Sequence, residues 1–220
     1  MEDSYILGRV DHTLLAPAAI WADIDKLCKE AIEFKTASVC IPPAYVKRVR
    51  EAFPTLRICN VIGFPLGYDV LATKALAVQA AIEDGTDEID MVVNITDVKN
   101  GHFAAVSTEL QVLKQIANEK ILKVIIETCY LTNEEKISLC EIITEAGADY
   151  IKTSTGFGTA GATLHDIELF KKHIGPDVKM KAAGGIRTRE DMVAFIEAGC
   201  SRLGTSSAIK ILTGRAAGAY

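Results

Sequence analysis

The chain has 220 residues, with 24 lysines and arginines against 29 aspartates and glutamates, so its formal net charge is −5 and its isoelectric point is about 5.5. A composition of 49% hydrophobic and 24% charged residues excludes a disordered chain, and the length leaves too little room for two full domains. We therefore expect one domain over residues 1–220. The sequence has no basic block and no apolar run of about 18 residues, which argues against nucleic-acid and membrane partners.

The first residues and the cysteines indicate the compartment. The chain starts with an acidic segment that lacks the apolar region of a secretion signal. Its six cysteines show no close pairing, which is typical of reduced thiols. We expect a cytoplasmic protein.

Short apolar runs rich in β-branched residues recur along the chain, and a segment with helical spacing follows each of them. This alternation predicts βα units and a parallel sheet. Eight units in 220 residues suit a compact (β/α)8 TIM barrel, with a doubly wound sheet as the competing architecture. The expected strands cover residues 10–14, 38–41, 57–62, 88–93, 122–127, 150–153, 179–183 and 202–204.

Threonines followed three residues later by an acidic residue predict where three of the helices begin. Thr132, Thr163 and Thr188 each have this capping pattern. The fifth, sixth and seventh helices are therefore expected to start directly after these residues.

A weak internal repeat favours the barrel. Three segments, residues 83–90, 145–152 and 197–204, each place a glycine where a helix ends and a strand follows. The fifth residue after the glycine is Asp90, Lys152 or Gly204, on the fourth, sixth and eighth strands. Because alternate strands of a barrel share interior layers, Asp90 and Lys152 should point into the same layer. Ordinary helix-to-strand turns would explain the glycines but not these two charges.

Lysines on three neighbouring strands are candidates for chemistry. Lys152 ends the sixth strand, and Lys181 lies near the carboxyl end of the seventh, where barrel enzymes have their active sites. Lys179 should also point inward, in a lower layer and paired with a carboxylate such as Glu127. Lys123 on the fifth strand is predicted to be a partner in the charge network.

Lys152 and Lys181 should lie close enough to affect each other's protonation. At about 6 Å, two like charges repel by roughly 3 kcal/mol at an effective dielectric of about 20, so one amine should lose its proton near neutral pH. A neutral lysine is the nucleophile that Schiff-base chemistry requires. Asp90 opposes this effect, and fits best if it pairs mainly with Lys181.

Two glycine-containing loops predict a phosphate site. Gly184 and Gly185 follow the seventh strand, and Gly204 opens the segment that contains Ser206 and Ser207 after the eighth. Backbone N–H groups can approach an anion at such glycines, although two ordinary tight turns after the strands would give the same glycine pattern. Residues 156–161 match a dinucleotide-binding pattern, but the expected acidic residue on the next strand is missing. The four histidines and six cysteines lack zinc-ligand spacing, so we expect no metal and no cofactor.

Six ordered motifs resemble the 2-deoxyribose-5-phosphate aldolase family over essentially the full length. They begin at Asp11, Ser38, Glu88, Leu122, Tyr150 and Lys181, and read DHT, SVCI, EIDMV, LKVIIET, YIKTSTG and KAAGGIR. The resemblance implies a metal-free class I aldolase, a lyase of deoxyribonucleoside catabolism. Such an enzyme reversibly cleaves 2-deoxy-D-ribose 5-phosphate to acetaldehyde and D-glyceraldehyde 3-phosphate.

The resemblance also implies roles for individual residues. Lys152 would form the Schiff base, Lys181 would be the neighbouring ammonium, and Asp90 would move protons through water. Some members have a lysine where this chain has Phe157. The implied phosphate contacts are Gly156, Gly184, Gly185, Gly204, Ser206 and Ser207, and the implied substrate-pocket residues are Asp11, Thr13, Cys40, Thr155 and the terminal Tyr220.

Two other functions remain open. The same barrel could host an isomerase or synthase acting on a phosphorylated metabolite, or a non-catalytic sugar-phosphate binding protein. The isomerase or synthase gives no reason for Lys152 to lie beside Lys181, and the binding protein predicts ligand binding without carbon–carbon cleavage. For assembly, we expect a homodimer or a higher homo-oligomer.

Overall fold

A computed structural model describes residues 1–214 of the chain. Eight parallel strands close into a barrel in sequence order, each paired with its neighbours and β8 paired with β1. The strands are β1 (Val10–Thr13), β2 (Ser38–Ile41), β3 (Ile58–Ile62), β4 (Glu88–Val92), β5 (Ile121–Ile125), β6 (Tyr150–Lys152), β7 (Lys179–Ala183) and β8 (Arg202–Thr205). The predicted (β/α)8 barrel is confirmed, and the doubly wound alternative is wrong.

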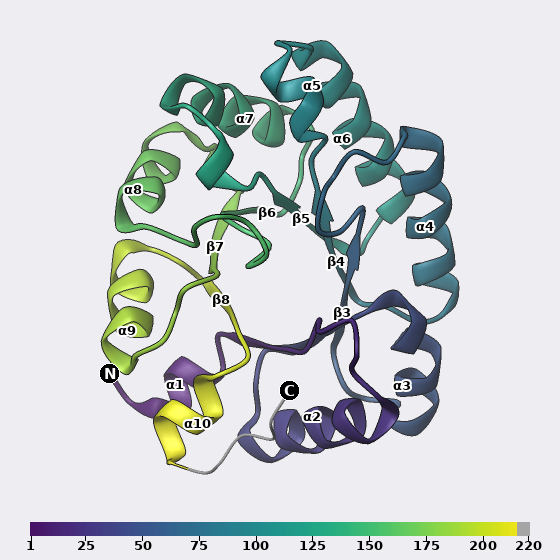
Figure 1. Cartoon of the computed structure of the whole chain (residues 1–220), viewed down its shortest axis with the longest axis vertical. Coiled ribbons are helices and arrows are strands. Elements are labelled where there is room, and N and C mark those ends of the chain that lie inside the picture. Colours follow the sequence, from purple (N-terminus) through teal and green to yellow (C-terminus); the bar gives the residue numbers. More distant parts are fainter. Residues whose placement is uncertain (215–220) are drawn as a thin grey trace.

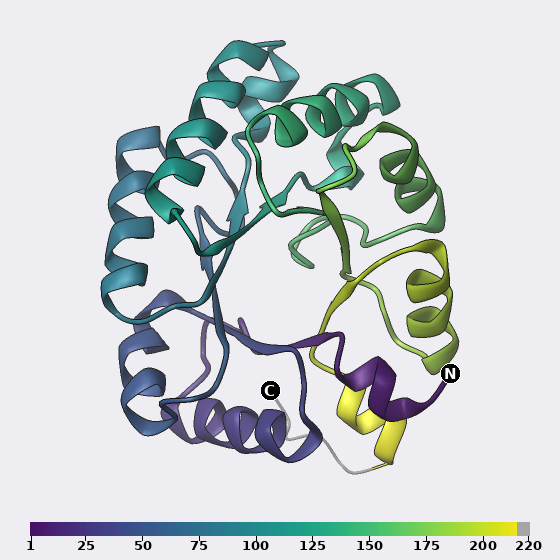
Figure 2. The same cartoon turned by 180° about the vertical axis from the view of Figure 1, so that it is seen from behind.

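Helices surround the barrel in both views (Figures 1 and 2). Two short 3₁₀ turns, η1 (Pro43–Tyr45) and η2 (Thr128–Tyr130), follow β2 and β5. The helices are α1 (Asp3–Leu7), α2 (Trp21–Phe34), α3 (Val46–Ala52), α4 (Leu71–Glu83), α5 (Ile95–Lys99), α6 (Phe103–Ala117), α7 (Asn133–Glu145), α8 (Leu164–His173), α9 (Arg189–Ala198) and α10 (Ala208–Thr213). None of those within residues 1–214 is long and apolar enough to cross a membrane.

The predicted helix starts are confirmed at all three threonines. Thr132, Thr163 and Thr188 directly precede α7, α8 and α9. The side chain of each threonine accepts a hydrogen bond from the backbone N–H three residues later, in the first turn of its helix. Two features differ from the expectation. An additional short helix, α1, precedes β1, and the segment after β4 forms α5 and α6 rather than one helix. The break falls between Lys99 and Phe103, where Gly101 has φ of 72°, and Asn94 caps the start of α5.

The main apolar core lies between the barrel and the helices. Ile89, Ile151 and Leu203 point into it, as the repeat predicts, together with side chains from the surrounding helices. Side chains alternate along each strand, so the residues between them face the barrel interior. Asp90, Lys123 and Lys181 are fully buried there. The interior of this barrel is therefore charged, whereas its outer surface is apolar.

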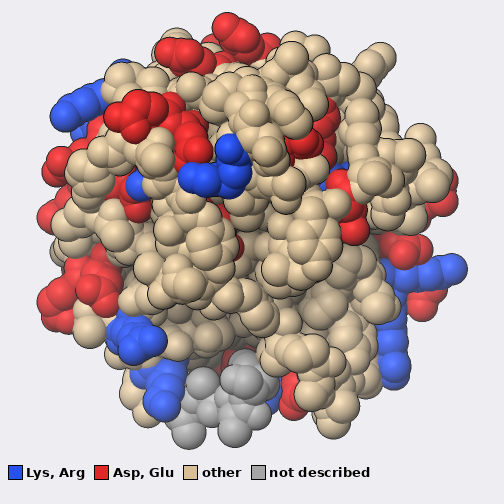
Figure 3. Space-filling model, turned by 45° about the horizontal axis from the view of Figure 1, so that its top comes forward, with Lys and Arg blue, Asp and Glu red and all other residues tan. Residues whose placement is uncertain are grey.

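On the face drawn in Figure 3, acidic and basic side chains lie mainly near the edge, and uncharged side chains occupy most of the middle. The charges on this face are mixed in sign rather than gathered into one basic surface.

Candidate active site

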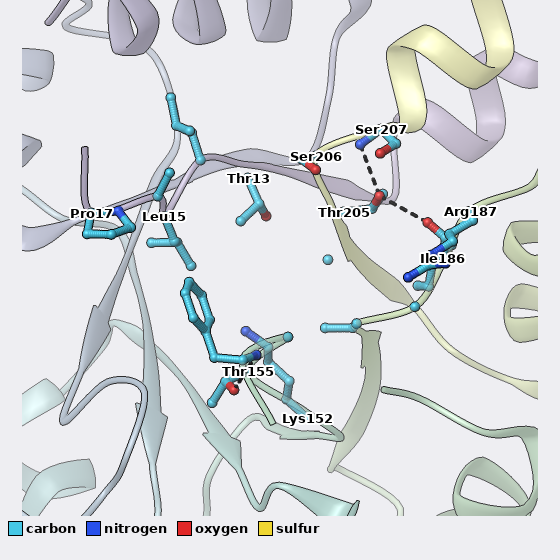
Figure 4. A pocket seen from close by; sticks show the side chains of 18 residues that line it. Thr13, Leu15, Pro17, Lys152, Thr155, Ile186, Arg187, Thr205, Ser206 and Ser207 are labelled. Carbon is cyan, nitrogen blue, oxygen red and sulfur yellow. Dashed lines mark hydrogen bonds between the residues drawn. The ribbon is translucent and has the colours of Figure 1, made fainter. Parts of the chain in front are cut away.

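A pocket of about 450 Å³ opens at the carboxyl ends of the strands. Its walls come from the segments after β1, β6, β7 and β8, and Lys152 reaches it from the last position of β6 (Figure 4). Nine predicted site residues line the pocket: Thr13, Lys152, Thr155, Gly156, Gly184, Gly185, Gly204, Ser206 and Ser207. Loops from distant parts of the sequence thus meet around one lysine.

Asp90 joins the two candidate lysines beneath this pocket. The Nζ atoms of Lys152 and Lys181 each lie 2.6 Å from the same oxygen, Oδ2 of Asp90. The two nitrogens are therefore no further apart than twice that distance, and their predicted proximity is confirmed. The expectation that Asp90 pairs mainly with Lys181 is wrong, because Asp90 also binds Lys123 through Oδ1 at 2.8 Å.

Six of the buried charges form a closed ring, which we call the charge ring. Going round it, Asp11 binds Lys181, Lys181 binds Asp90, Asp90 binds Lys123, Lys123 binds Glu88, Glu88 binds Arg202, and Arg202 returns to Asp11. Each is at most 6% exposed. Acidic and basic groups alternate, so every charge has an opposite charge on both sides, as buried ions require.

The ring determines the protonation states of the groups beneath the pocket. Burial alone would lower the pKa of Lys181, but the carboxylates of Asp11 and Asp90 raise it well above the ordinary value. Burial would raise the pKa of Asp90, yet Lys123, Lys152 and Lys181 hold it well below its usual range. Lys181 is therefore an ammonium and Asp90 a carboxylate at neutral pH.

Asp11 and Cys40 lie below the pocket wall rather than on it. Asp11 is a member of the ring, and its Oδ1 accepts a hydrogen bond of 2.8 Å from Ser38. Cys40 packs with Cys59 and Val61 beneath Leu15 and Phe64. Tyr220 lies outside the described residues.

Lys179 is placed differently from the prediction. It is the first residue of β7, and its side chain is exposed at the amino-terminal rim of the barrel. Glu127 lies at the opposite end, just after β5, so the two residues cannot pair. The predicted network role of Lys123 is confirmed, because this lysine binds both Glu88 and Asp90.

Glu127 anchors the loop that follows Lys152 at the end of β6. It lies in the left-handed backbone region (φ 53°), which ends β5 two residues earlier than predicted. Its carboxylate accepts hydrogen bonds from the backbone N–H and the hydroxyl of Thr155, and that hydroxyl accepts one from the N–H of Phe157 at 3.0 Å. Burial raises the pKa of Glu127. The sequence indicated a charge here but not its partner.

The two glycine loops lie against each other and against the loop after β6. A Cβ atom at Gly161 would come within 2.3 Å of the backbone of Gly184. The residues that match the dinucleotide-binding pattern therefore allow close backbone contact between two rim loops. The hydroxyl of Thr205 joins the loops after β7 and β8, since it donates to Ile186 O at 3.5 Å and accepts from Ser207 N at 3.1 Å (Figure 4).

Sequence reasoning missed two clusters of possible metal ligands. Cys40, Cys59 and Asp90 offer ligand atoms within 4.8 Å of one another, as do Asp11, Cys59 and Glu88. The carboxylates in both clusters already bind lysine or arginine side chains of the ring. These residues suit the chain's own cations better than a metal ion.

Glu88 and Arg202 were also missed as members of the site. The internal repeat held their signal, because they occupy its first and third copies two residues before Asp90 and Gly204. Residues two apart on a strand face the same side, so both point into the barrel.

The pattern of the DeoC/LacD family aldolases matches residues 6–218. A deoxyribose-phosphate aldolase from Clostridium botulinum (strain Alaska E43 / Type E3) is 58% identical, with 100% of each chain covered. One from Clostridioides difficile (strain 630) is 56% identical, covering 94% of this chain and 95% of the relative. A solved deoxyribose phosphate aldolase from Aeropyrum pernix, described as a unique tetramer, superimposes with a TM-score of 0.90 at 31% identity, covering 96% of this chain and 91% of that one. The chain belongs to the DeoC/LacD family of aldolases.

Proposed function

We propose that this chain is a class I aldolase that reversibly cleaves 2-deoxy-D-ribose 5-phosphate to acetaldehyde and D-glyceraldehyde 3-phosphate, with Lys152 as the Schiff-base nucleophile. Deoxyribose-phosphate aldolases at 56% and 58% identity support the substrate. The observation that carries the mechanism is that Lys152, on the pocket wall, shares one oxygen of Asp90 with Lys181. The whole chain, residues 1–220, is proposed as one catalytic domain.

The first step forms the iminium ion. Neutral Lys152 attacks the C1 aldehyde of the open-chain sugar, and the resulting carbinolamine takes up a proton from the solvent on its hydroxyl and loses water. The cationic nitrogen then withdraws electrons from the neighbouring carbons. Lys181 remains protonated because Asp11 and Asp90 raise its pKa. It is the cation that shares Oδ2 of Asp90 with Lys152.

The second step breaks a carbon–carbon bond. Acetaldehyde contains two carbons, so the bond that breaks joins C2 and C3. Its electron pair moves toward the iminium nitrogen and gives an enamine, while the C3 hydroxyl transfers its proton through water to the carboxylate of Asp90. Glyceraldehyde 3-phosphate leaves. Protonation of the enamine at C2 and hydrolysis of the imine then release acetaldehyde and restore Lys152.

The rim is proposed to bind the phosphate. Gly156, Gly184 and Gly185 bring backbone close to the pocket, and the exposed hydroxyl of Ser206 faces the same space. Gly204 also leaves room for Lys181, since a Cβ atom there would lie 3.2 Å from Cε of that lysine. The N–H of Ser207 already donates to Thr205, so Ser207 would contribute its hydroxyl.

A coupled assay for glyceraldehyde 3-phosphate tests the function. Wild-type protein should release this product from 2-deoxyribose 5-phosphate, and Lys152→Ala should not. An isomerase or synthase would convert a different phosphorylated metabolite without an amine adduct, and a binding protein would bind the sugar phosphate without cleavage. Either result would overturn the proposal.

We also propose a cytoplasmic homo-oligomer. The six cysteines, all within residues 1–214, are free. The relative from Aeropyrum pernix is described as tetrameric. Size-exclusion chromatography with light scattering would give the molar mass of the assembly, and a monomer would contradict the proposed assembly.

A further inference from the structure

Glu88 and Arg202 have no task in the proposed reaction, although they are buried in the same barrel. Neither residue lines the pocket, and they are 0% and 6% exposed. They form the part of the charge ring that lies furthest from the pocket, at the first positions of β4 and β8. Burying an arginine and a glutamate away from the substrate is costly, so their position calls for an explanation.

Both residues are connected to the reacting lysine through the ring. Arg202 donates to Glu88 through two nitrogens, at 2.9 and 2.7 Å, and also donates to Asp11. Asp11 binds Lys181. On the other side, Glu88 lies 2.7 Å from Lys123, which binds Asp90. The two paths meet at Asp90, which forms an ion pair with Lys152.

The charges of the ring balance without Lys152. The ring holds three carboxylates and three cations, and Lys152 is an additional cation that shares Oδ2 of Asp90 with Lys181. Asp90 is the only carboxylate of the described residues within 4.0 Å of Lys152 Nζ. The ring is thus electrically complete when Lys152 is a neutral amine, which is the form that attacks an aldehyde. A charge removed from the ring is poorly replaced by water, because the ring is buried.

We propose that Glu88 and Arg202 are positioning residues that set the pH at which Lys152 becomes nucleophilic, and that they act with opposite sign. This inference rests on the proposed function. Arg57 approaches Glu88 at 3.7 Å but is exposed, so water screens its charge. Among residues 1–214, the ionisable groups that act directly on Lys152 are Asp90 of β4, Glu127 after β5, Cys40 of β2 and Lys181 of β7. The next groups behind them are Asp11 of β1, Cys59 of β3, Lys123 of β5 and Arg202 of β8.

The test compares two neutral variants across pH. Arg202→Met removes a positive charge, so Lys152 should keep its proton to higher pH. The acid limb of the kcat/KM profile should therefore shift to higher pH. Glu88→Gln removes a negative charge, so the acid limb should shift to lower pH. Each shift should be about one pH unit, the effect of one charge about 10 Å away at an effective dielectric of about 20. The rate of borohydride trapping of acetaldehyde on Lys152 should move in the same way.

Three further variants separate charge from structure. The double variant Glu88→Gln/Arg202→Met removes one charge of each sign and should return the limb to the wild-type pH, even if kcat is lower. Arg202→Lys loses the paired hydrogen bonds but keeps the charge, so it should not move the limb. A remote control is Lys136→Met, which breaks the buried 2.7 Å ion pair with Asp166 between α7 and α8 and should also leave the limb in place.

Opposite shifts that cancel in the double variant would support the inference. Shifts in the same direction, or no shift in either variant, would overturn it while leaving the aldolase proposal intact if wild-type protein cleaves the sugar phosphate. If wild-type protein neither cleaves the substrate nor forms an adduct, the proposed function itself fails. Glu88→Gln is close to isosteric and by itself tests the direction in which the acid limb shifts. Misfolding of Arg202→Met would therefore still leave a decisive result.

Discussion

The floor and the rim of the pocket are built in different ways. The floor consists of side chains on strands: Lys152 and, beneath it, Asp90 and Lys181. Both lysines bind the same oxygen of Asp90, and the other oxygen of Asp90 binds a further lysine of the ring. The rim consists mainly of loop backbone, with glycines at 156, 184 and 185 in the left-handed region. Changes to the floor should therefore alter the chemical step, whereas changes to the rim should alter affinity for the phosphate.

The largest effect is expected at Lys152. Lys152→Ala removes the proposed nucleophile, so kcat should fall at least about 1,000-fold. The variant should remain folded, because it removes the additional cation and leaves the six-membered ring complete. Circular dichroism would check the fold and the coupled assay the rate. Near-normal turnover would refute the assignment.

Lys181→Leu should have the next largest effect. It removes the cation that binds both Asp11 and Asp90, so kcat should fall about 100-fold and the pH–rate profile should change. Two buried carboxylates also lose a partner, so the free energy of unfolding should fall by about 3 kcal/mol. Urea titration and kcat measured from pH 5 to 10 would check both effects. An unchanged profile would argue against this role.

Gly184→Ala tests the rim. Gly184 has φ of 81°, and a Cβ atom would lie 3.1 Å from Cα of Gly161. Strain at this position should move the loop and raise KM for the phosphorylated sugar about tenfold, with little effect on adduct formation from acetaldehyde alone. An equal loss with both compounds would mean that the floor and rim are not separable. Gly147→Ala is a matched control, since that glycine has φ of 69° and lies away from the pocket.

The smallest effect is expected at Phe157. This side chain is 53% exposed, packs edge-on against Phe64 with ring centroids 5.4 Å apart, and lines the pocket. Phe157→Lys adds a cation at the mouth, so KM for 2-deoxyribose 5-phosphate should fall about threefold, while KM for unphosphorylated 2-deoxyribose stays the same. A Phe157→Leu variant controls for loss of the ring. An equal change for both sugars would show that the added charge does not act on the phosphate.

The difference between floor and rim also explains what could be predicted from the sequence. Period-2 alternation placed Asp90 and Lys152 inside the barrel, because a strand leaves each side chain only two directions. The same rule applied to Glu88 and Arg202, but their partners come from strands far away in the sequence and could not be paired without the barrel register. Lys179 shows the limit of this rule, since an inward position at the end of a strand still reaches solvent.

Loop contacts were less predictable. Glu127 anchors Thr155 because the chain adopts a left-handed conformation at Glu127, two residues after β5 ends, and non-glycine residues rarely signal that conformation in sequence. The glycines at 184 and 185 were visible as a motif, but their contact with Gly161 depends on how two loops pack.

Trapping with acetaldehyde and borohydride tests the central claim most directly. Reduction of the imine should leave one ethyl group on Lys152 and none on Lys123 or Lys181, whose ammonium groups are held in the charge ring. Peptide mass spectrometry would locate it. Absence of an adduct, or its presence on scattered surface lysines, would contradict the account.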